Sequence, residues 1–415
     1  MNNAGLYDAI IVGAGPAGTS AAIHLAMKGA RVLLAEAKRF PRAKLCGEFI
    51  SPECLVHFRR LGVMDEMIAA GGVELAETIF YGRQGRSLRV PSEWFANGGR
   101  ALGLSRAEMD RRLINRARMI GVEVLEEAQA VGLIIEDNCV CGVQLKSDGV
   151  VRAYRSFVSV DATGRGRALV QYAARHKSVR LERSRKDVQP LSRKRASLVA
   201  FKAHLVDAQV ARGCCEIYFY EGGYGGLSGV ESGLSNLCFI ASAEQVRKCG
   251  GDAERVMHEV VMRNRRAAQT LARTRIASEW LCVAIESFGR RELVPADGLI
   301  TVGDAASFID PFTGSGMLMA LESGELAAEM IARRLPQLSV GESFKALATD
   351  YQARYNERFS SRLRMCSLLR RAAFAPPTIA HLVMNALNIS ERVRRRVARA
   401  TRRTSQHSLH SGALH

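Results

Sequence analysis

Residues 13–18, Gly13-Ala14-Gly15-Pro16-Ala17-Gly18, decide the fold class of this chain. They follow the apolar run 7–12, which predicts a buried strand. Residues 17–29 after them predict a helix, and residues 30–36 predict a second strand. A strand, a GxGxxG turn, a helix and a strand within about thirty residues form the fingerprint of a dinucleotide-binding βαβ unit.

Each part of this turn has a physical role in holding a dinucleotide. Gly13 permits the tight turn, Gly15 lets the backbone approach the pyrophosphate, and Gly18 lets helix and strand pack closely. The helix N-terminus then offers free N–H groups to the phosphates. Glu36, 18 residues after Gly18, stands where a carboxylate accepts from the ribose hydroxyls. We therefore expect the whole turn, with Glu36 and Ala37, to bind the cofactor.

A second glycine-rich turn spans residues 301–316, TVGDAASFIDPFTGSG. It resembles the Gly-Asp motif of the glutathione-reductase-type FAD fold. In that fold the Asp binds the ribityl chain, and the glycines that follow begin a helix aimed at the flavin. Such a helix N-terminus stabilises the anion of a reduced flavin. The resemblance implies FAD as the cofactor, and the residues that match are Gly303, Asp304, Pro311, Gly314, Ser315, Gly316 and Met317.

Residues 7–335 as a whole resemble the geranylgeranyl reductase-like branch of FAD-dependent oxidoreductases, kin to aromatic hydroxylases and flavin halogenases. Besides the two glycine turns, the resemblance rests on residues 40–52 (FPRAKLCGEFISP), 103–113 (GLSRAEMDRRL), 161–166 (DATGRG) and 222–238 (GGYGGLSGVESGLSNLC). The halogenase signature WxWxIP is absent, because the two tryptophans are isolated. This departure argues against halogenation.

The resemblance also implies further cofactor contacts. Arg106 would contact the cofactor, and Lys44, Cys46 and Gly47 would lie in the loop that passes the isoalloxazine. A segment near the adenosine and pyrophosphate would contain Asp161, Ala162 and Gly164, although an ordinary turn at a strand end has the same composition. Ala130 completes the predicted cofactor-binding set.

Two residues are candidates for catalysis, Cys46 and Tyr224. A thiol beside a flavin relays a proton or forms an adduct, but a buried cysteine more often serves as a small apolar filler. Tyr224 lies in residues 222–226, which we place between strands as a wall above the flavin. Tyr218 and Tyr220 either line the same substrate site or pack on two faces of a sheet. Residues 222–226 open no helix, so no second dinucleotide domain is predicted, and the reductant is transient NAD(P)H or a partner protein.

The predicted architecture is α/β, a Rossmann-like FAD-binding domain with an inserted sheet-rich substrate domain and a basic helical C-terminal segment. The FAD-binding domain comprises residues 1–75, 105–175 and 290–340. The substrate domain comprises residues 76–104 and 176–289, including one helix over 253–271. The C-terminal segment is 341–415.

The net charge of +18 is concentrated in two segments. Residues 361–415 hold eleven Arg and one Glu, and residues 173–195 hold nine basic and two acidic side chains. Such a field is a solvated face, or it attracts an anionic membrane or an acidic partner such as an electron-donor protein. The apolar stretches 372–379 and 381–389 favour peripheral membrane contact. No nucleic-acid recognition motif accompanies the charge.

The remaining features place the chain among metal-free cytoplasmic enzymes. Its ten cysteines form no CxxC pair, so no metal site is expected. No apolar run reaches the length of a transmembrane helix, and no signal sequence begins the chain, which predicts a cytoplasmic protein.

Three functions are compatible with these features. The first is a reductase or dehydrogenase acting on carbon–carbon bonds of an apolar, lipid-like or secondary-metabolite substrate, by hydride transfer at flavin N5. The second is a monooxygenase acting through a flavin C4a-hydroperoxide. The third is a flavoprotein that serves as an electron-transfer partner. The same fold supports all three chemistries, so the fold does not choose among them.

Overall fold

The fold is seen in a computed structural model of the 415-residue chain. The structure describes residues 5–83, 85–95, 98–182, 197–285, 288–373 and 390–402. The apolar stretch 381–389, all but two residues of the stretch 372–379, and most of the basic segment 173–195 lie outside the described residues.

The first sheet carries the glycine turn. Its strands are β1 (Leu6–Val12), β2 (Val32–Ala35), β8 (Glu123–Leu125), β9 (Gln129–Glu136), β10 (Cys139–Ser147), β11 (Val150–Asp161) and β19 (Leu299–Thr301). They lie in the order β8-β2-β1-β11-β10-β9, with β19 paired to β11. β8, β2, β1, β11 and β19 are mutually parallel, whereas β9 and β10 run antiparallel as a meander on β11. The carboxyl ends of β1, β11 and β19 therefore meet at one edge, where ligands of such sheets bind.

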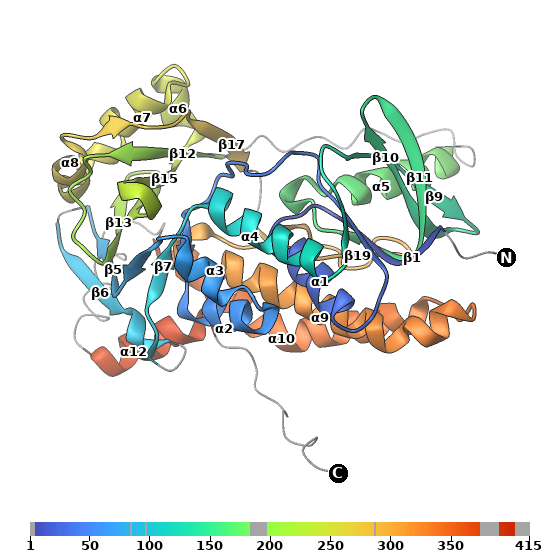
Figure 1. The fold of residues 1–415 in the computed structure, drawn as a ribbon. Coiled ribbons are helices and arrows are strands. Elements are labelled where there is room, and N and C mark those ends of the chain that lie inside the picture. Colours follow the sequence, from blue (N-terminus) through green and yellow to red (C-terminus); the bar gives the residue numbers. More distant parts are fainter. Residues whose placement is uncertain are drawn as a thin grey trace, which may run out of the picture.

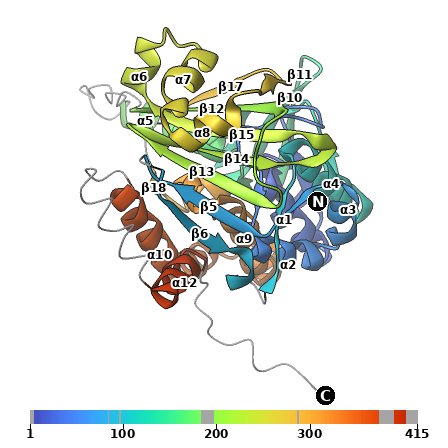
Figure 2. The ribbon, with the colours of Figure 1, turned by 90° about the vertical axis from the view of Figure 1, so that its left-hand side faces the viewer.

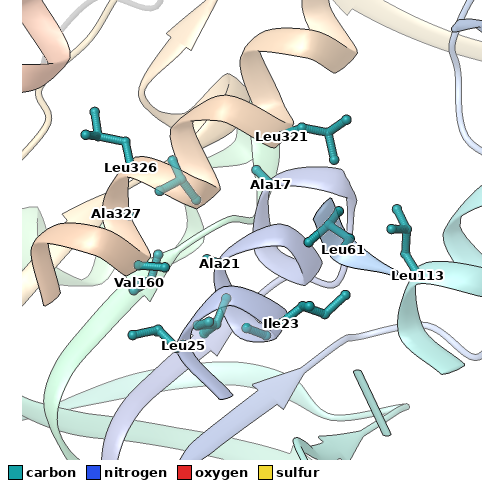
Figure 3. Close-up of a cluster of buried hydrophobic side chains, with 14 of the residues drawn as sticks. Ala17, Ala21, Ile23, Leu25, Leu61, Leu113, Val160, Leu321, Leu326 and Ala327 are labelled. Carbon is teal, nitrogen blue, oxygen red and sulfur yellow. The ribbon is translucent and has the colours of Figure 1, made fainter. Parts of the chain in front are cut away.

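Two helices that lie far apart in the sequence pack against each other beneath this sheet (Figure 1). They are α1 (Pro16–Ala26) and α9 (Gly316–Ser339). A Cβ on Gly324 would lie 2.3 Å from the carbonyl oxygen of Ala17, so the two helices approach as closely as glycine allows. Ser20 Oγ donates to the carbonyl of Leu321 at 2.8 Å. Figure 3 shows this part of the buried core, with Ala17 and Ala21 on α1 and Leu321, Leu326 and Ala327 on α9.

Further helices enclose the same core. They are α2 (Pro52–Leu61), α3 (Met64–Ala69), α4 (Arg106–Met119) and α10 (Lys345–Ala373). On the far face of the sheet lies α5 (Ala168–Glu182). The helix predicted over 253–271 belongs with the second sheet, which is described next.

The second sheet has eight strands and lies at the opposite end of the molecule from β9 to β11 (Figure 1). Its strands are β5 (Glu77–Tyr81), β6 (Ser87–Pro91), β12 (Leu198–Val206), β13 (Cys214–Tyr220), β14 (Gly223–Gly229), β15 (Ser235–Ser242), β16 (Arg275–Ile276) and β17 (Leu281–Ile285). They run in the order β16-β12-β15-β14-β13-β5-β6, with β17 paired to β12. Only the β13–β5 pair is parallel, so the strand pairs are otherwise those of an antiparallel sheet.

Short helices cover one face of this second sheet (Figure 2). They are α6 (Ala243–Lys248), α7 (Ala253–Glu259) and α8 (Arg265–Leu271). The expectation of one helix over 253–271 is wrong, because Asn264 interrupts it. The Asn264 backbone is extended, and its side chain accepts from the N–H groups of Arg266 and Ala267 to cap α8. Asparagine favours such a cap over a helix interior.

The glycine-rich residues 222–226 also differ from expectation. We placed them between strands, but Gly223–Gly229 is itself strand β14. A Cβ on Gly223 would lie 1.9 Å from the carbonyl oxygen of Ile240 on β15. The glycines therefore permit a close approach of neighbouring backbones inside the sheet.

The remaining elements join the two sheets. A small sheet contains β3 (Phe49–Ile50), β7 (Ala101–Gly103) and β4 (Val73–Leu75), and a two-stranded ribbon pairs β18 (Gly289–Arg290) with β20 (Ser307–Phe308). The last helix, α12 (Glu391–Ala400), lies beside β6 (Figures 1 and 2). Among the described residues, no helix is both long and apolar enough to cross a membrane.

Candidate functional site

The turn after β1 packs against the strand end after β11. Gly13 has a φ of 103°, and a Cβ there would lie 2.4 Å from the carbonyl oxygen of Ala162. A Cβ on Gly18 would lie 1.9 Å from the carbonyl oxygen of Gly13. Both positions require glycine because a side chain there would clash with the backbone of this same chain. The structure thus places Asp161, Ala162 and the first glycine turn side by side.

Gly15 differs from its two neighbours in the motif. It precedes α1 with a φ of −78°, and its side-chain position is open, the nearest atom to a Cβ being Arg106 Nη2 at 3.7 Å. No side chain caps this end of α1. Its first N–H groups therefore remain available to an anion, as the N-terminus of a dinucleotide-binding helix requires.

Glu36 anchors the other side of the turn at the end of β2. Its Oε2 accepts from the N–H of Ala14 at 2.9 Å and from Arg42 at 3.1 Å, and its Oε1 accepts from the N–H of Lys38 at 3.2 Å. Each carboxylate oxygen has two lone pairs, so Oε1 can still accept from a ribose hydroxyl. Ala37 beside it is exposed.

Arg106 lies between the two predicted halves of the site. Its guanidinium is held by Asp110 through bonds of 2.9 and 2.8 Å, and the Cys46 thiol lies near enough to influence its charge. Burial alone would lower the pKa of Arg106, but Asp110 and Cys46 hold it above its usual range. Arg106 therefore stays cationic and links the loop containing Cys46 to the glycine turn.

Lys44 and Asp304 add opposite charges to this region. The pKa of Lys44 is lowered, first by the protein atoms around its ammonium and then by the charges of Arg42 and Arg106. The pKa of Asp304 is raised by burial, although Arg165, Arg106 and Lys44 act in the opposite direction. The cations Lys44 and Arg106 in this region suit the pyrophosphate of FAD.

The Gly-Asp turn meets α1 directly. Gly303 has a φ of 58°, and a Cβ there would lie 2.8 Å from the Cβ of Ala17. Its N–H donates to Ser323 Oγ at 2.9 Å, which fixes the turn on α9. Asp304 follows with a partly exposed side chain, and no described residue hydrogen-bonds its carboxylate. That carboxylate fits a ligand that brings hydroxyl donors, such as a ribityl chain.

The second glycine group begins α9 under the C-terminal segment. Ser315 precedes the helix, but its hydroxyl donates to the carbonyl of Thr401 at 3.0 Å and leaves the helix end uncapped. Arg402 Nη2 donates to the carbonyl of Thr313 at 3.4 Å. Gly314 has a φ of 62°. Pro311 begins the short 3-10 turn Pro311–Thr313 that precedes it. The α9 N-terminus, at Gly316 and Met317, is thus open toward an anion.

The remaining predicted residues lie as follows. Gly47 is exposed with no atom within 4 Å of a Cβ, and Gly164 is likewise open with a φ of 74°. Ala130 is buried in the core beside β10, in the cluster that also holds Val12 and Ala35. Two residues earlier, the N–H of Ala128 donates to the carbonyl of Glu36 at 2.9 Å.

The second sheet turns one face toward the loop containing Cys46. Paired residues of antiparallel strands share a face, so Lys202, Cys238 and Gly226 lie on one face with Ile217. Gly226 is partly exposed in mid-sheet, and a Cβ there would meet only the tip of Ile217, at 3.0 Å. Asn236 Nδ2 donates to the carbonyl of Cys46 at 3.1 Å. The sheet is thereby fixed over this loop.

The three tyrosines of the second sheet separate. Tyr218 and Tyr220 pack in the core under α6 to α8, on the face opposite to Gly226, and bond Glu216 and the carbonyl of Ile240. They do not line a site beside Cys46. Tyr224 lies on the Gly226 face, and its hydroxyl donates to Asp310 Oδ1 at 2.5 Å, just before the α9 turn.

Sequence reasoning missed one polar group at the junction of the two sheets. Glu48 is fully buried and contacts Lys202 Nζ at 2.5 Å and His204 Nε2 at 2.7 Å, both on β12. Burial alone would raise the pKa of Glu48, but the His204 hydrogen bond and the Lys202 charge lower it. No fixed spacing links residues about 150 positions apart in the chain, so only the glutamate's place in the flavin loop could have drawn attention to it.

Comparison with known proteins agrees with this geometry. Residues 6–165 match a family described as an FAD binding domain. The match covers the glycine turn, Glu36, the loop containing Cys46, and Arg106. The chain is an FAD-dependent oxidoreductase.

Relatives and solved structures extend the likeness over most of the chain. A digeranylgeranylglycerophospholipid reductase of Methanococcoides burtonii is 27% identical over 376 residues, covering 89% of this chain and 84% of the relative. A menaquinone reductase of Mycolicibacterium smegmatis is 24% identical over 387 residues, covering 89% and 86%. A geranylgeranyl bacteriochlorophyll reductase-like protein of Thermoplasma acidophilum has the same fold, with a TM-score of 0.74, 20% identity and 97% of each chain covered. The expected relation to the geranylgeranyl reductase-like branch is confirmed.

Flavin-dependent halogenases share the architecture as well. A flavin-dependent brominase superposes with a TM-score of 0.77 at 21% identity, covering 95% of this chain and 93% of its own. At this identity the likeness concerns the fold alone.

Proposed function

We propose that this chain is an FAD-dependent reductase that reduces carbon–carbon double bonds of an apolar, lipid-like substrate. The observation that carries the proposal is the face of the second sheet with Ile217, Gly226 and Cys238, fixed over the loop that contains Cys46. The similar reductase of Methanococcoides burtonii is named for a geranylgeranyl phospholipid. Apolar side chains with a small number of placed polar groups, here Lys202 and His204 on the same face, are the lining that binds such a ligand.

The chain's own residues divide the work of binding. The α1 N-terminus and Gly15 receive the pyrophosphate, Glu36 the adenosine ribose and Asp304 the ribityl chain. Arg106 holds the loop of Cys46 in place through its backbone N–H, which donates to Glu48 Oε1 at 2.8 Å. When bound, the reduced cofactor supplies hydride.

The sheet and the Cys46 loop contribute the walls. Tyr224 ties β14 to Asp310, directly before the turn that begins α9. Cys46 lies between Arg106 and the sheet, where it positions substrate or carries a proton. We take NAD(P)H, bound transiently, or an electron-donor protein as the source of electrons.

We further propose a cytoplasmic protein that rests on an anionic membrane through α12. On this helix Arg394 lies over the Trp94 ring and Arg399 donates to the Trp94 carbonyl at 2.7 Å. Arg392, Arg395 and Arg396 are exposed. Their outward charge suits an anionic lipid surface, where each basic side chain contributes about 1 kcal/mol.

Anaerobic half-reactions test the reductase proposal. The FAD-loaded protein is reduced with NADPH or dithionite and mixed with a phospholipid that carries geranylgeranyl chains, in detergent micelles. The proposal predicts flavin reoxidation and a product heavier by two hydrogens per reduced bond. Reoxidation by oxygen alone, with an oxygenated product, would favour the monooxygenase. Reoxidation only by an electron-acceptor protein would favour the electron-transfer role.

A further inference from the structure

Three ionisable side chains form a continuous hydrogen-bonded chain where the two sheets meet. Glu48 Oε1 contacts Lys202 Nζ at 2.5 Å, and Glu48 Oε2 contacts His204 Nε2 at 2.7 Å. The N–H of Arg106 also donates to Glu48 Oε1, at 2.8 Å. One carboxylate thus bridges a lysine and a histidine through its two different oxygens.

The two ends of this chain differ in exposure, and its middle is fully buried. The Lys202 side chain is 3% exposed, Glu48 is fully buried, and the His204 side chain is 17% exposed. Lys202 lies on the sheet face that carries Cys238 and Gly226. His204, two residues along β12, lies on the same face. Of the two side chains, His204 is the one that water reaches, and Lys202 is the one enclosed by protein.

Burial of these three charged groups costs folding stability, so their presence calls for a functional reason. Ion pairs withdrawn from water lose hydration that their mutual attraction seldom exceeds, and apolar replacements of similar volume are often as stable. Glu48 also has a left-handed backbone with a φ of 53°, which a glutamate rarely adopts. Backbone of this kind occurs where the surroundings hold a functional group in place.

The proposed reduction needs a route for protons. Each double bond that gains a hydride at one carbon gains a proton at the other, and an apolar wall holds no water to supply it. We propose that Lys202, Glu48 and His204 are the proton inlet of this reaction, with Lys202 the acid toward the substrate and His204 the group that exchanges with water. This inference rests on the proposed function.

The step balances as follows. A Lys202 N–H bond breaks and a C–H bond forms at the substrate carbon next to the one that receives hydride, which leaves Lys202 a neutral amine. A proton taken from water by His204 passes from Nε2 to Glu48 Oε2. After a turn of the carboxyl group, Glu48 returns it to Nζ. The hydride supplies both electrons, so one proton leaves the solvent for each bond reduced.

A conservative exchange separates proton supply from charge. Lys202→Arg keeps a cation beside Glu48, but a guanidinium does not give up its proton in a protein. Reduction of the flavin should stay at the wild-type rate, and reoxidation by the geranylgeranyl phospholipid should slow by about 100-fold or more. The matched control is Lys248→Arg, at an exposed lysine paired with Glu244. Wild-type reoxidation by Lys202→Arg would overturn the inlet.

A second readout needs no turnover. In the oxidised holoenzyme with ¹⁵N-labelled lysine side chains, the exchange of the Lys202 ammonium protons with water is measured by NMR. His204→Gln keeps a hydrogen bond to Glu48 without carrying protons, and it should slow that exchange by about tenfold or more. The exposed His258→Gln is its control. Unchanged exchange in His204→Gln would overturn the inlet, while failure of the wild type to reduce the lipid would overturn the proposed function alone.

Discussion

The glycine turn offers a matched pair of substitutions that separates folding from cofactor binding. A Cβ at Gly18 would lie 1.9 Å from the carbonyl oxygen of Gly13, which is backbone that cannot yield. A Cβ at Gly15 would have nothing nearer than Arg106 Nη2, at 3.7 Å. Gly18→Ala should therefore damage the protein itself, whereas Gly15→Ala should damage only the cofactor site.

The magnitudes follow from these distances. Gly15 has a φ of −78°, which alanine adopts without strain. Alanine lowers the entropy of the unfolded chain, which stabilises the fold, but it caps a helix less well than glycine, which destabilises it. Each effect is below about 1 kcal/mol, so the two nearly cancel. A methyl group between the α1 N-terminus and a pyrophosphate costs about 1–3 kcal/mol of crowding. At about 1.4 kcal/mol per tenfold, FAD should bind roughly 5- to 150-fold more weakly.

The assay is FAD titration followed by flavin fluorescence, with urea unfolding of the FAD-free protein in parallel. Gly15→Ala should unfold at the wild-type urea concentration and bind FAD weakly. Gly18→Ala should unfold at a lower urea concentration, because its free energy of unfolding is reduced by about 1–3 kcal/mol or more. Gly5→Ala, at an exposed glycine with no atom within 4 Å of a Cβ, is the control for both. Wild-type FAD affinity in Gly15→Ala would refute the assignment of this turn to the pyrophosphate.

Three further predictions concern the charged residues around the site. Arg362 is fully buried and pairs with Glu322 at 2.5 Å. Arg362→Met leaves the glutamate charge unpaired and should lower the free energy of unfolding, measured by urea titration, by about 3–5 kcal/mol. The double variant Arg362→Met, Glu322→Met should recover most of that loss. Arg402→Ala removes the bond to the Thr313 carbonyl and should weaken FAD binding several-fold, by about 0.5–1.5 kcal/mol, in the fluorescence titration. The pKa of Glu48 is lowered by folding, so this group stabilises the protein above the usual glutamate pKa of about 4.3 and loses that effect as pH falls through its folded pKa. The stability difference between wild type and Glu48→Gln should therefore shrink below about pH 4, and a constant difference across pH 3–7 would contradict the reasoning.

The cofactor half of the site was predictable because its chemistry follows local sequence. A strand, a glycine turn and a helix must be contiguous, so Gly13–Gly18 and Glu36 can be read from spacing. The Gly-Asp turn was found by resemblance. The structure adds the reason for each glycine: Gly13 and Gly18 are fixed by contacts within the protein, Gly15 is open, and Gly303 lies on Ala17.

The junction between the sheets was not predictable in the same way. Glu48, Lys202 and His204 share no local pattern, and their contacts depend on how β12 lies over the loop of Cys46. The faces of Tyr218 and Tyr224 depend on strand register, which alternation alone leaves open. The helix expected over 253–271 is interrupted at Asn264, whose extended backbone and side-chain cap begin α8.

The C-terminal arginines show a similar limit. Their number suggested a uniform basic surface, yet Arg362 is buried, Arg402 contacts the loop before α9, and Arg399 bonds Trp94. Composition gives the charge of a segment, and only the packing divides it into structural and exposed parts.

Anaerobic mixing of the pre-reduced, FAD-loaded protein with a geranylgeranyl phospholipid tests the central claim most directly. The account predicts that the lipid reoxidises the flavin in the absence of oxygen and that its mass rises by two hydrogens for each bond reduced. A flavin that stays reduced with the lipid and reoxidises only when oxygen is admitted, giving an oxygenated product, would contradict it.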